Sequence, residues 1–131
     1  MKNKIKVVAA IIENDLGEVL CALRSPHMSM PNLWEFPGGK VENGESLEDA
    51  IEREISEELL CKVKALDVFH DNTYEYDNVF VNLICLKCKL IEGTPVNTEH
   101  STLIWLNRKN LNSLKWAPAD MAAVKKLSKM K

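Results

Sequence analysis

The segment from residue 39 to residue 61 restricts this chain most, because it places acidic residues on the side of a helix that should face a core. It reads GKVENGESLEDAIEREISEELLC, in which a glycine turn precedes a helical pattern. At about 100° per residue, Glu54 and Glu58 share an arc with apolar Ile51, and Glu57 lies at its edge. Carboxylates one turn apart, roughly 6 Å, repel by about 0.7 kcal/mol in water and about 3 kcal/mol at an effective dielectric of 20. The segment therefore predicts a partner for these acids.

A divalent cation is the partner that the pattern favours. Without one, the helix would lose stability or the acids would take up protons. Mg²⁺ and Mn²⁺ prefer oxygen ligands and would remove the conflict. The alternative is a solvated acidic face, which is the ordinary explanation of a glutamate-rich helix. It is disfavoured here because the acids share the apolar side, and because Arg53 is the only base between Lys40 and Lys62.

The spacing of these residues resembles the Nudix box, Gly-x5-Glu-x7-Arg-Glu-U-x-Glu-Glu-x-Gly-U, in which U is aliphatic. Gly39 is followed after five residues by Glu45, and after seven more by the run Arg-Glu-Ile-Ser-Glu-Glu at 53–58. The flank LWEFPGGK at 33–40 resembles the MutT branch of that family, the nucleoside triphosphate pyrophosphohydrolases. Seven specified positions at fixed spacing make this a strong resemblance.

The resemblance extends over nearly all of the chain. It includes VVAAII at 7–12, the Glu92-Gly93 turn that leads to Glu99, and APAD at 117–120. One position departs from the box, because Leu60 stands where a glycine is expected near the helix C-terminus. Glycine enters the left-handed conformation freely, so we expect a different cap or a longer helix here.

The length and composition predict one compact domain over residues 1–131. A chain of 131 residues with 46% hydrophobic content buries roughly two thirds of its unfolded surface. The net charge of -2 gives no reason to expect a nucleic-acid partner. The apolar stretch near the N-terminus is too short to span a bilayer. We predict a cytoplasmic protein, a monomer or homodimer, with no membrane partner.

The four cysteines lack the spacing of a secreted disulfide framework. Cys85 and Cys88 form a C-x2-C pair inside the apolar run 79–90. Their odd offset should point the two side chains to opposite faces of a strand, and a zinc site would need a second pair.

The elements follow from turns and periodicity. Ile5–Ile12 and Glu18–Leu23 should form a hairpin, and 24–32 a loop. Ser46, with an acid three residues later, should cap a helix that runs to about Leu59. Further strands are expected at 62–70, 73–76, 79–90 and 102–106, with a turn at 77–78 and a helix near 119–129. These elements suit an α/β/α sandwich around a central mixed sheet, which the Nudix resemblance also implies.

The resemblance implies a metal site of carboxylates and one backbone carbonyl. The residues that match the family's ligands are Gly38, Glu54, Glu57, Glu58 and Glu99. Mg²⁺ is the expected ion, with Mn²⁺ as a possible substitute. Such ions neutralise phosphate oxygens and lower the pKa of a bound water.

The catalytic residues implied by the resemblance are Glu45, Arg53, Glu54 and Glu57 in the box, and Glu99 in the MutT-like loop before Trp105. Glu54 is the first choice as general base and Glu99 the second. Arg53 is expected to hold Glu45 and a further carboxylate by forked hydrogen bonds. The alternatives are an exposed loop acid for Glu99 and a surface helix pair for Arg53.

The substrate-binding residues implied by the MutT branch are Arg24, Trp34, Glu35, Phe36, Pro37, Gly38, Asn78 and Asp120. Arg24 is expected to contact phosphate or base, with a solvent-facing arginine as the alternative. Phe36 is expected to line the nucleoside pocket by stacking, and core packing is the alternative for Trp34. Asp120 is expected to read the base edge, with a helix N-cap as the alternative.

The nucleobase of the substrate stays open between an oxidised guanine and a cytosine. Asn78 stands near where some guanine-directed relatives carry arginine, and Asp120 where asparagine is expected, which disfavours oxidised guanine (8-oxo-dGTP). The LWEF and APAD segments look closer to cytidine triphosphate pyrophosphohydrolases. An aspartate accepts from the cytosine amine, whereas a protonated one donates to a carbonyl.

The predicted function is magnesium-dependent hydrolysis of a nucleoside triphosphate to the monophosphate and pyrophosphate, serving nucleotide-pool sanitation. The family resemblance also implies a role in DNA repair. One alternative is another nucleoside diphosphate derivative, such as a nucleotide sugar, whose hydrolases often carry extra loops. A second is a non-catalytic nucleotide- or protein-binding module on the same fold. Loss of box acids would mark that module, and all of them are present.

Overall fold

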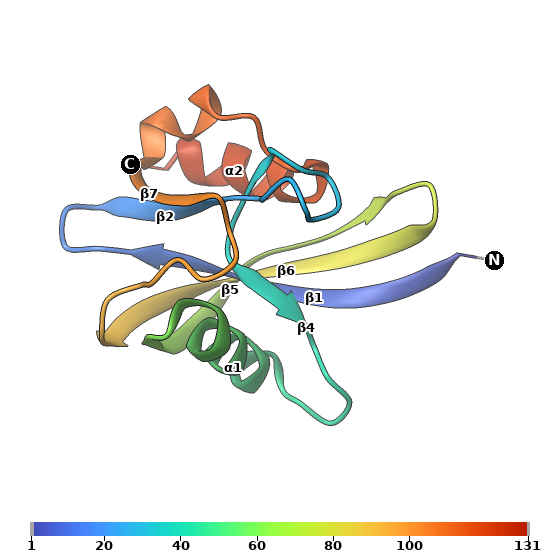
Figure 1. The fold of residues 1–131 in the computed structure, drawn as a ribbon, viewed down its shortest axis with the longest axis horizontal. Helices are drawn as coiled ribbons and strands as arrows, with labels where there is room; N and C mark the ends of the chain where they lie inside the picture. The colour runs from blue at the N-terminus through green and yellow to red at the C-terminus, as the bar shows by residue number, and fades with distance from the viewer. Residues whose placement is uncertain (1, 131) are drawn as a thin grey trace.

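The computed structural model describes residues 2–130, so Met1 and Lys131, the two ends of the predicted domain, lie outside it. In this range seven strands form one mixed sheet with helices on both faces (Figure 1). The strands are β1 (Asn3–Glu13), β2 (Glu18–Leu23), β3 (Trp34–Glu35), β4 (Gly38–Lys40), β5 (Lys62–Glu75), β6 (Val79–Glu92) and β7 (Thr102–Asn107). The helices are α1 (Leu47–Leu59), α2 (Met121–Ser128) and the 3-10 turns η1 (Arg108–Ser113) and η2 (Pro118–Asp120).

The sheet runs in the order β3-β2-β1-β6-β5, with β4 paired to β1 and β7 paired to β2. The hairpin expected between the first two strands is present, because β1 and β2 are antiparallel. β1 also runs parallel to β6 over the whole stretch from Asn3↔Val79 to Glu13↔Lys89. This parallel pair makes the sheet mixed, as the sequence predicts.

Alternation along β1 feeds two separate cores. Val8, Ala10 and Ile12 pack on one face with α1, whereas Ala9 and Ile11 pack on the other face with α2. Figure 1 shows α1 and α2 on opposite sides of the sheet. The structure therefore confirms the α/β/α sandwich. Cys88 and Cys85 lie in these two opposite cores, as their odd offset predicts.

Two predicted strands, 62–70 and 73–76, are in fact the single strand β5. The register of β5 against β6 shifts between Ala65 and Val68 and again between Val68 and His70. The predicted gap fell instead at Asp71 and Asn72, residue types typical of turns, but both pair with β6 and the strand continues through them. The last helix also differs, because α2 begins at Met121 after the separate turn η2.

The predicted glycine turn is in fact the short strand β4, antiparallel to β1. Neither Gly38 nor Gly39 has a positive φ, so backbone freedom does not explain them. A Cβ at Gly38 would overlap the Val8 carbonyl, and one at Gly39 would overlap the Glu54 carboxylate. The two glycines are therefore required by close packing between β1, β4 and α1.

Helix α1 begins and ends near the predicted residues. The Ser46 hydroxyl accepts from the Asp49 N–H at 3.1 Å, which confirms the predicted cap. At the other end Leu60 itself adopts the left-handed conformation, with φ 53° and ψ 37°. The different cap and the longer helix that the missing glycine suggested are therefore both wrong.

Replacing Leu60 by glycine should raise the free energy of unfolding by about 1 kcal/mol, because a left-handed residue with a Cβ is strained. The side chain of Leu60 is 59% exposed, so little burial is lost. Urea denaturation of Leu60→Gly and Leu60→Ala measures the effect, since alanine keeps the strain and should bring no gain. Equal stability of the two variants would contradict the prediction.

Within the part of the chain that the structure describes, no helix is long and apolar enough to cross a membrane.

Candidate functional site

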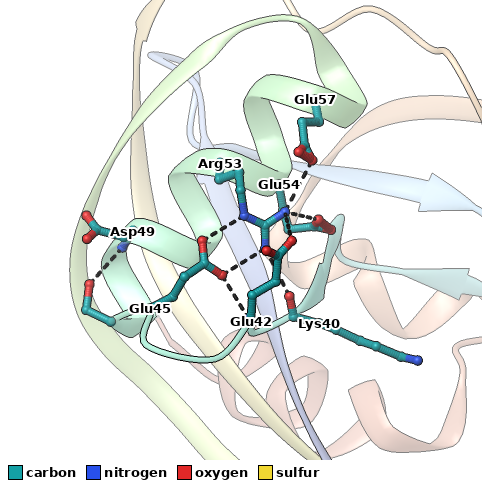
Figure 2. A network of polar contacts seen from close by, with 8 residues as sticks. Lys40, Glu42, Glu45, Asp49, Arg53, Glu54 and Glu57 are labelled. Atoms are coloured by element: carbon teal, nitrogen blue, oxygen red, sulfur yellow. Dashed lines mark hydrogen bonds and ion pairs between the residues drawn. The ribbon is translucent and has the colours of Figure 1, made fainter.

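Arg53 lies at the centre of the acid cluster on α1 (Figure 2). Its guanidinium donates to both carboxylate oxygens of Glu45, at 2.7 and 2.9 Å. It also donates to Glu54 at 2.7 Å and to Glu57 at 3.2 Å. These bonds lower the pKa of Glu45 to about 2 and raise that of Arg53. The forked contacts predicted for Arg53 are present, and Arg53 offsets part of the repulsion that the sequence assigned to a cation alone.

The pKa of Glu58 is shifted in the opposite direction to that of Glu45. Its side chain is only 10% exposed. Burial, together with the nearby charges of Glu35, Glu99 and Glu54, raises its pKa to about 8. A proton or a cation is therefore needed at Glu58 near neutral pH.

A cavity of about 230 Å³, which we call the acidic cavity, brings four predicted residues together. Its wall includes Gly38, Glu54, Glu58 and Glu99. Glu57 does not line it, because its side chain is 61% exposed beyond Arg53. The structure thus unites Glu99, from the loop before β7, with two acids of α1.

The donor chemistry of the acidic cavity fits a hard divalent cation. Glu54, Glu58 and Glu99 line one cavity, and oxygen is the ligand such ions prefer. Burial first and repulsion from neighbouring acids second raise the pKa of Glu58, and a cation would offset both. As they stand, however, no three acidic, histidine or cysteine side chains in residues 2–130 are arranged as a metal site. One oxygen of Glu54 is bonded to Arg53 instead.

His100 is a residue of this site that the sequence analysis missed. It is 6% exposed, and its Nε2 lies 2.8 Å from Glu35 Oε2. Its Nδ1 lies 3.4 Å from Glu58 Oε1. The only local signal was its place beside Glu99, and a lone histidine carries no periodicity that would mark it.

A second cavity of about 650 Å³, which we call the large cavity, adjoins the acidic one. Arg24, Glu35 and Asp120 line both cavities. Asn78 and Tyr76 line the large cavity alone. Its volume lies in the range of small-molecule sites, about 300–1,000 Å³. The two cavities therefore lie side by side and share part of their wall.

Arg24 is held by protein groups in this shared wall. Its Nη1 donates to Glu35 Oε1 at 2.7 Å, and its Nε donates to the Ser29 carbonyl at 2.7 Å. Arg24 is therefore not the solvent-facing arginine of the alternative. Its pairing fixes Glu35, whose other oxygen contacts His100.

Asp120 is buried at the junction of the cavities. Its Oδ2 accepts from the backbone N–H of Phe36 at 3.0 Å. Burial raises the pKa of Asp120 to about 8, although the Phe36 bond opposes the shift. Asp120 does occupy the N-cap position of α2, which was the alternative for it, but within residues 2–130 its side chain makes no capping bond to that helix.

The aromatic residues of the 34–37 segment lie in the core. Phe36 lines the acidic cavity, but it is only 2% exposed and its ring lies 4.8 Å from that of Trp116, so the ring packs in the core rather than in a position to stack on a base. Trp34 packs against the same core cluster, which was the alternative for it. Pro37 is fully buried. Neither Trp34 nor Pro37 lines the large or the acidic cavity.

Stability should fall as pH rises from about 4 to about 8. Asp120 has a folded pKa of about 8 against an ordinary 3.8, so the folded state binds one more proton across that window. Each such proton contributes up to about 1.4 kcal/mol per pH unit, and Glu58 acts in the same direction. Urea denaturation in EDTA at pH 5, 6 and 7 should show a shallower slope for Asp120→Asn. An unchanged slope would contradict the buried, protonated state of Asp120.

A family model described as the NUDIX domain matches residues 3–129 of this chain. The 8-oxo-dGTP diphosphatase of Escherichia coli K12 is 30% identical over 127 residues, which are 97% of this chain and 98% of that protein. The CTP pyrophosphohydrolase of the same organism is 36% identical over 117 residues, or 89% and 86% of the two chains.

A solved structure agrees with these matches. The MutT protein of methicillin-resistant Staphylococcus aureus 252, described as a Nudix hydrolase, superposes with a TM-score of 0.79 at 47% identity. The match covers 98% of each chain. The likeness therefore extends over the sheet and both helices.

Proposed function

Because the chain belongs to the Nudix family and is a Nudix hydrolase of the MutT type, we propose that it hydrolyses nucleoside triphosphates to monophosphates and pyrophosphate with Mg²⁺. The relatives named for 8-oxo-dGTP and for CTP support a nucleotide substrate. The proposed role is nucleotide-pool sanitation in the cytoplasm, by a monomer or homodimer of one domain.

The observation that carries this proposal is the shared wall of the two cavities. Arg24, Glu35 and Asp120 line both the large cavity and the acidic cavity. A nucleoside fits the large cavity, whose volume is about 650 Å³, and a phosphate chain can extend into the acidic one. Acids alone would repel that chain, so the acidic cavity suits phosphate only together with a divalent cation.

The proposed ligands are the Gly38 carbonyl and the carboxylates of Glu54, Glu57, Glu58 and Glu99. Nudix hydrolases generally use divalent metal ions, and the carboxylates around Glu58 support one here. When bound, Mg²⁺ would neutralise phosphate oxygens and acidify a bound water, and Mn²⁺ is a possible substitute. Glu57 would have to leave Arg53 to join the others.

Glu54 is the proposed general base. The reaction cleaves the bridge between the α- and β-phosphates. The oxygen of water bonds to one of these two phosphorus atoms, a proton of the water passes to the Glu54 carboxylate, and the other fragment leaves with the bonding electrons. Glu54 lines the acidic cavity, and Arg53 fixes one of its oxygens. Glu99 is the second choice, since it faces the same cavity. Arg53 and Glu45 act through position alone.

Asp120 is the proposed base-reading residue. With a pKa of about 8 it is largely protonated at neutral pH and can donate to a carbonyl, as oxidised guanine or cytosine presents. Asn78 lines the large cavity and supplies a second polar group. Both cytosine-type and 8-oxo-dGTP-type substrates are compatible with these two residues.

A product-resolved screen tests the proposal. Purified protein with Mg²⁺ is given CTP, dCTP, 8-oxo-dGTP, dGTP and a nucleotide sugar, and the products are separated by ion exchange. We expect monophosphate and pyrophosphate in equal amounts. Orthophosphate as the sole product would contradict the assigned bond. Cleavage of the nucleotide sugar alone would favour that substrate class, and magnesium-independent binding with no product would favour a binding module.

A further inference from the structure

The loop from residue 93 to residue 101 is fastened to the C-terminus of α1. The Val96 N–H donates to the Leu59 carbonyl at 2.8 Å, and the Thr98 hydroxyl donates to the Glu58 carbonyl at 2.5 Å. Ser101 N–H donates to Leu23 on β2 at 2.9 Å. These bonds satisfy helix carbonyls that would otherwise lack partners. They also fix the backbone on both sides of His100.

The ring of His100 lies between two carboxylates. Its Nε2 is 2.8 Å from Glu35 Oε2, a full hydrogen bond, and its Nδ1 is 3.4 Å from Glu58 Oε1. The side chain is 1% exposed. Among the described residues, the buried Nδ1 has no hydrogen-bond partner, and it lies within ion-pair distance of the Glu58 carboxylate.

Only one of the two carboxylates, that of Glu35, belongs to a residue that also lines the large cavity. Glu35 lines both cavities and pairs with Arg24 at 2.7 Å, whereas Glu58 lines the acidic cavity only. His100 therefore completes a chain Arg24–Glu35–His100–Glu58 that runs from the substrate side to the helix of acids. A purely structural histidine would need no carboxylate on either edge, since an apolar residue packs as well.

We propose that His100 is a positioning residue that holds Glu35 through Nε2 and Glu58 through Nδ1, and so couples substrate binding to the acidic cavity. The proposal deepens the proposed function and rests on it for its kinetic part. In this proposal His100 orients the Glu58 carboxylate to bind the cation, and it orients the Glu35 carboxylate, together with Arg24, to bind the nucleotide. Partners of this kind orient ligating carboxylates and are worth about 10–100-fold in affinity or activity.

Three variants separate the two contacts. In His100→Gln the side-chain amide reaches the place of Nε2 and keeps the bond to Glu35. In His100→Asn the shorter amide reaches the place of Nδ1 and keeps the contact to Glu58. His100→Leu removes both, and His70→Gln, on β5 away from both cavities, is the matched control.

The kinetic expectation is a split between the parameters. His100→Gln should lower kcat by about 10–100-fold with KM within twofold, because only the Glu58 contact is lost. His100→Asn should raise KM by about tenfold with kcat within threefold, because only the Glu35 bond is lost. His100→Leu should show both changes and His70→Gln neither. Equal proportional changes in the Gln and Asn variants would overturn the split.

Mn²⁺ affinity supplies a readout that needs no turnover. Titration calorimetry of the protein with Mn²⁺ alone should show about 10–100-fold weaker binding for His100→Gln and His100→Leu, but not for His100→Asn. Unchanged affinity and kinetics in His100→Leu would overturn the proposal. If Leu does not fold, the Gln and Asn variants decide it. If wild type cleaves no nucleotide, the proposed function has failed, and the Mn²⁺ series still decides whether His100 positions Glu58.

Discussion

Glu54→Gln should lower kcat for pyrophosphate release by about 10²–10⁴-fold, because the amide can no longer take the proton of the attacking water. Glutamine keeps the length and shape of the side chain, and its carbonyl can still accept from Arg53 as Glu54 does at 2.7 Å. The free energy of unfolding should therefore change by less than about 1 kcal/mol. A continuous pyrophosphate assay and urea denaturation of the same preparation measure both quantities.

Two companion variants make the result specific. Glu48→Gln removes an exposed acid from the first turn of the same helix and should leave the rate unchanged. Glu99→Gln tests the second choice of base, which lines the same cavity. Full activity of Glu54→Gln with loss of activity in Glu99→Gln would transfer the base role to Glu99.

Gly38→Ala should lower the free energy of unfolding by about 3 kcal/mol or more, because its Cβ would overlap the Val8 carbonyl and force β4 away from β1. Gly39→Ala meets only the end of the Glu54 side chain, which can move. It should cost about 1 kcal/mol in stability but should lower kcat about as much as Glu54→Gln. The neighbouring glycines thus separate a structural requirement from a catalytic one.

Urea denaturation and the pyrophosphate assay on the two alanine variants check this pair. In a strand without close neighbours, alanine is favoured over glycine by about 0.5–1 kcal/mol. An increase in stability for Gly38→Ala would therefore contradict the close approach of β1 and β4. Normal turnover in Gly39→Ala would show that Glu54 tolerates displacement.

The helix and its acids could be predicted because their signals are local. The cap at Ser46, the end at Leu59 and the spacing of Glu54 and Glu58 all follow from helical periodicity within one short segment. The layer order followed from alternating strands and helices. The resemblance of the loop before Trp105 to the MutT branch then placed Glu99, which the structure brings to the same cavity as the helix acids.

The contacts that complete the site join residues far apart in sequence. Glu35 and His100 are 65 positions apart, and Phe36 and Asp120 are 84 apart. No periodicity within one element reports such a pair. The burial of Phe36 against Trp116 was missed for the same reason, since an aromatic residue beside a glycine strand fits a pocket and a core equally well.

In the sequence, Arg53 is a single base among many acids, so the balancing charge was expected to come from a cation outside the protein. The structure shows that one planar guanidinium serves Glu45, Glu54 and Glu57 together. Arg53 therefore neutralises more than one carboxylate, and burial raises the pKa of Glu58.

The parallel pairing of β1 with β6 also dictates when the protein can become active during its synthesis. The first strand must wait for a partner that begins at Val79, and Asp120 comes later still. Local hairpins form in microseconds, but so distant a pairing is slow. On the ribosome, β1 therefore lacks its parallel partner until Val79 and the residues after it have emerged, and the large cavity lacks part of its wall until Asp120 has emerged.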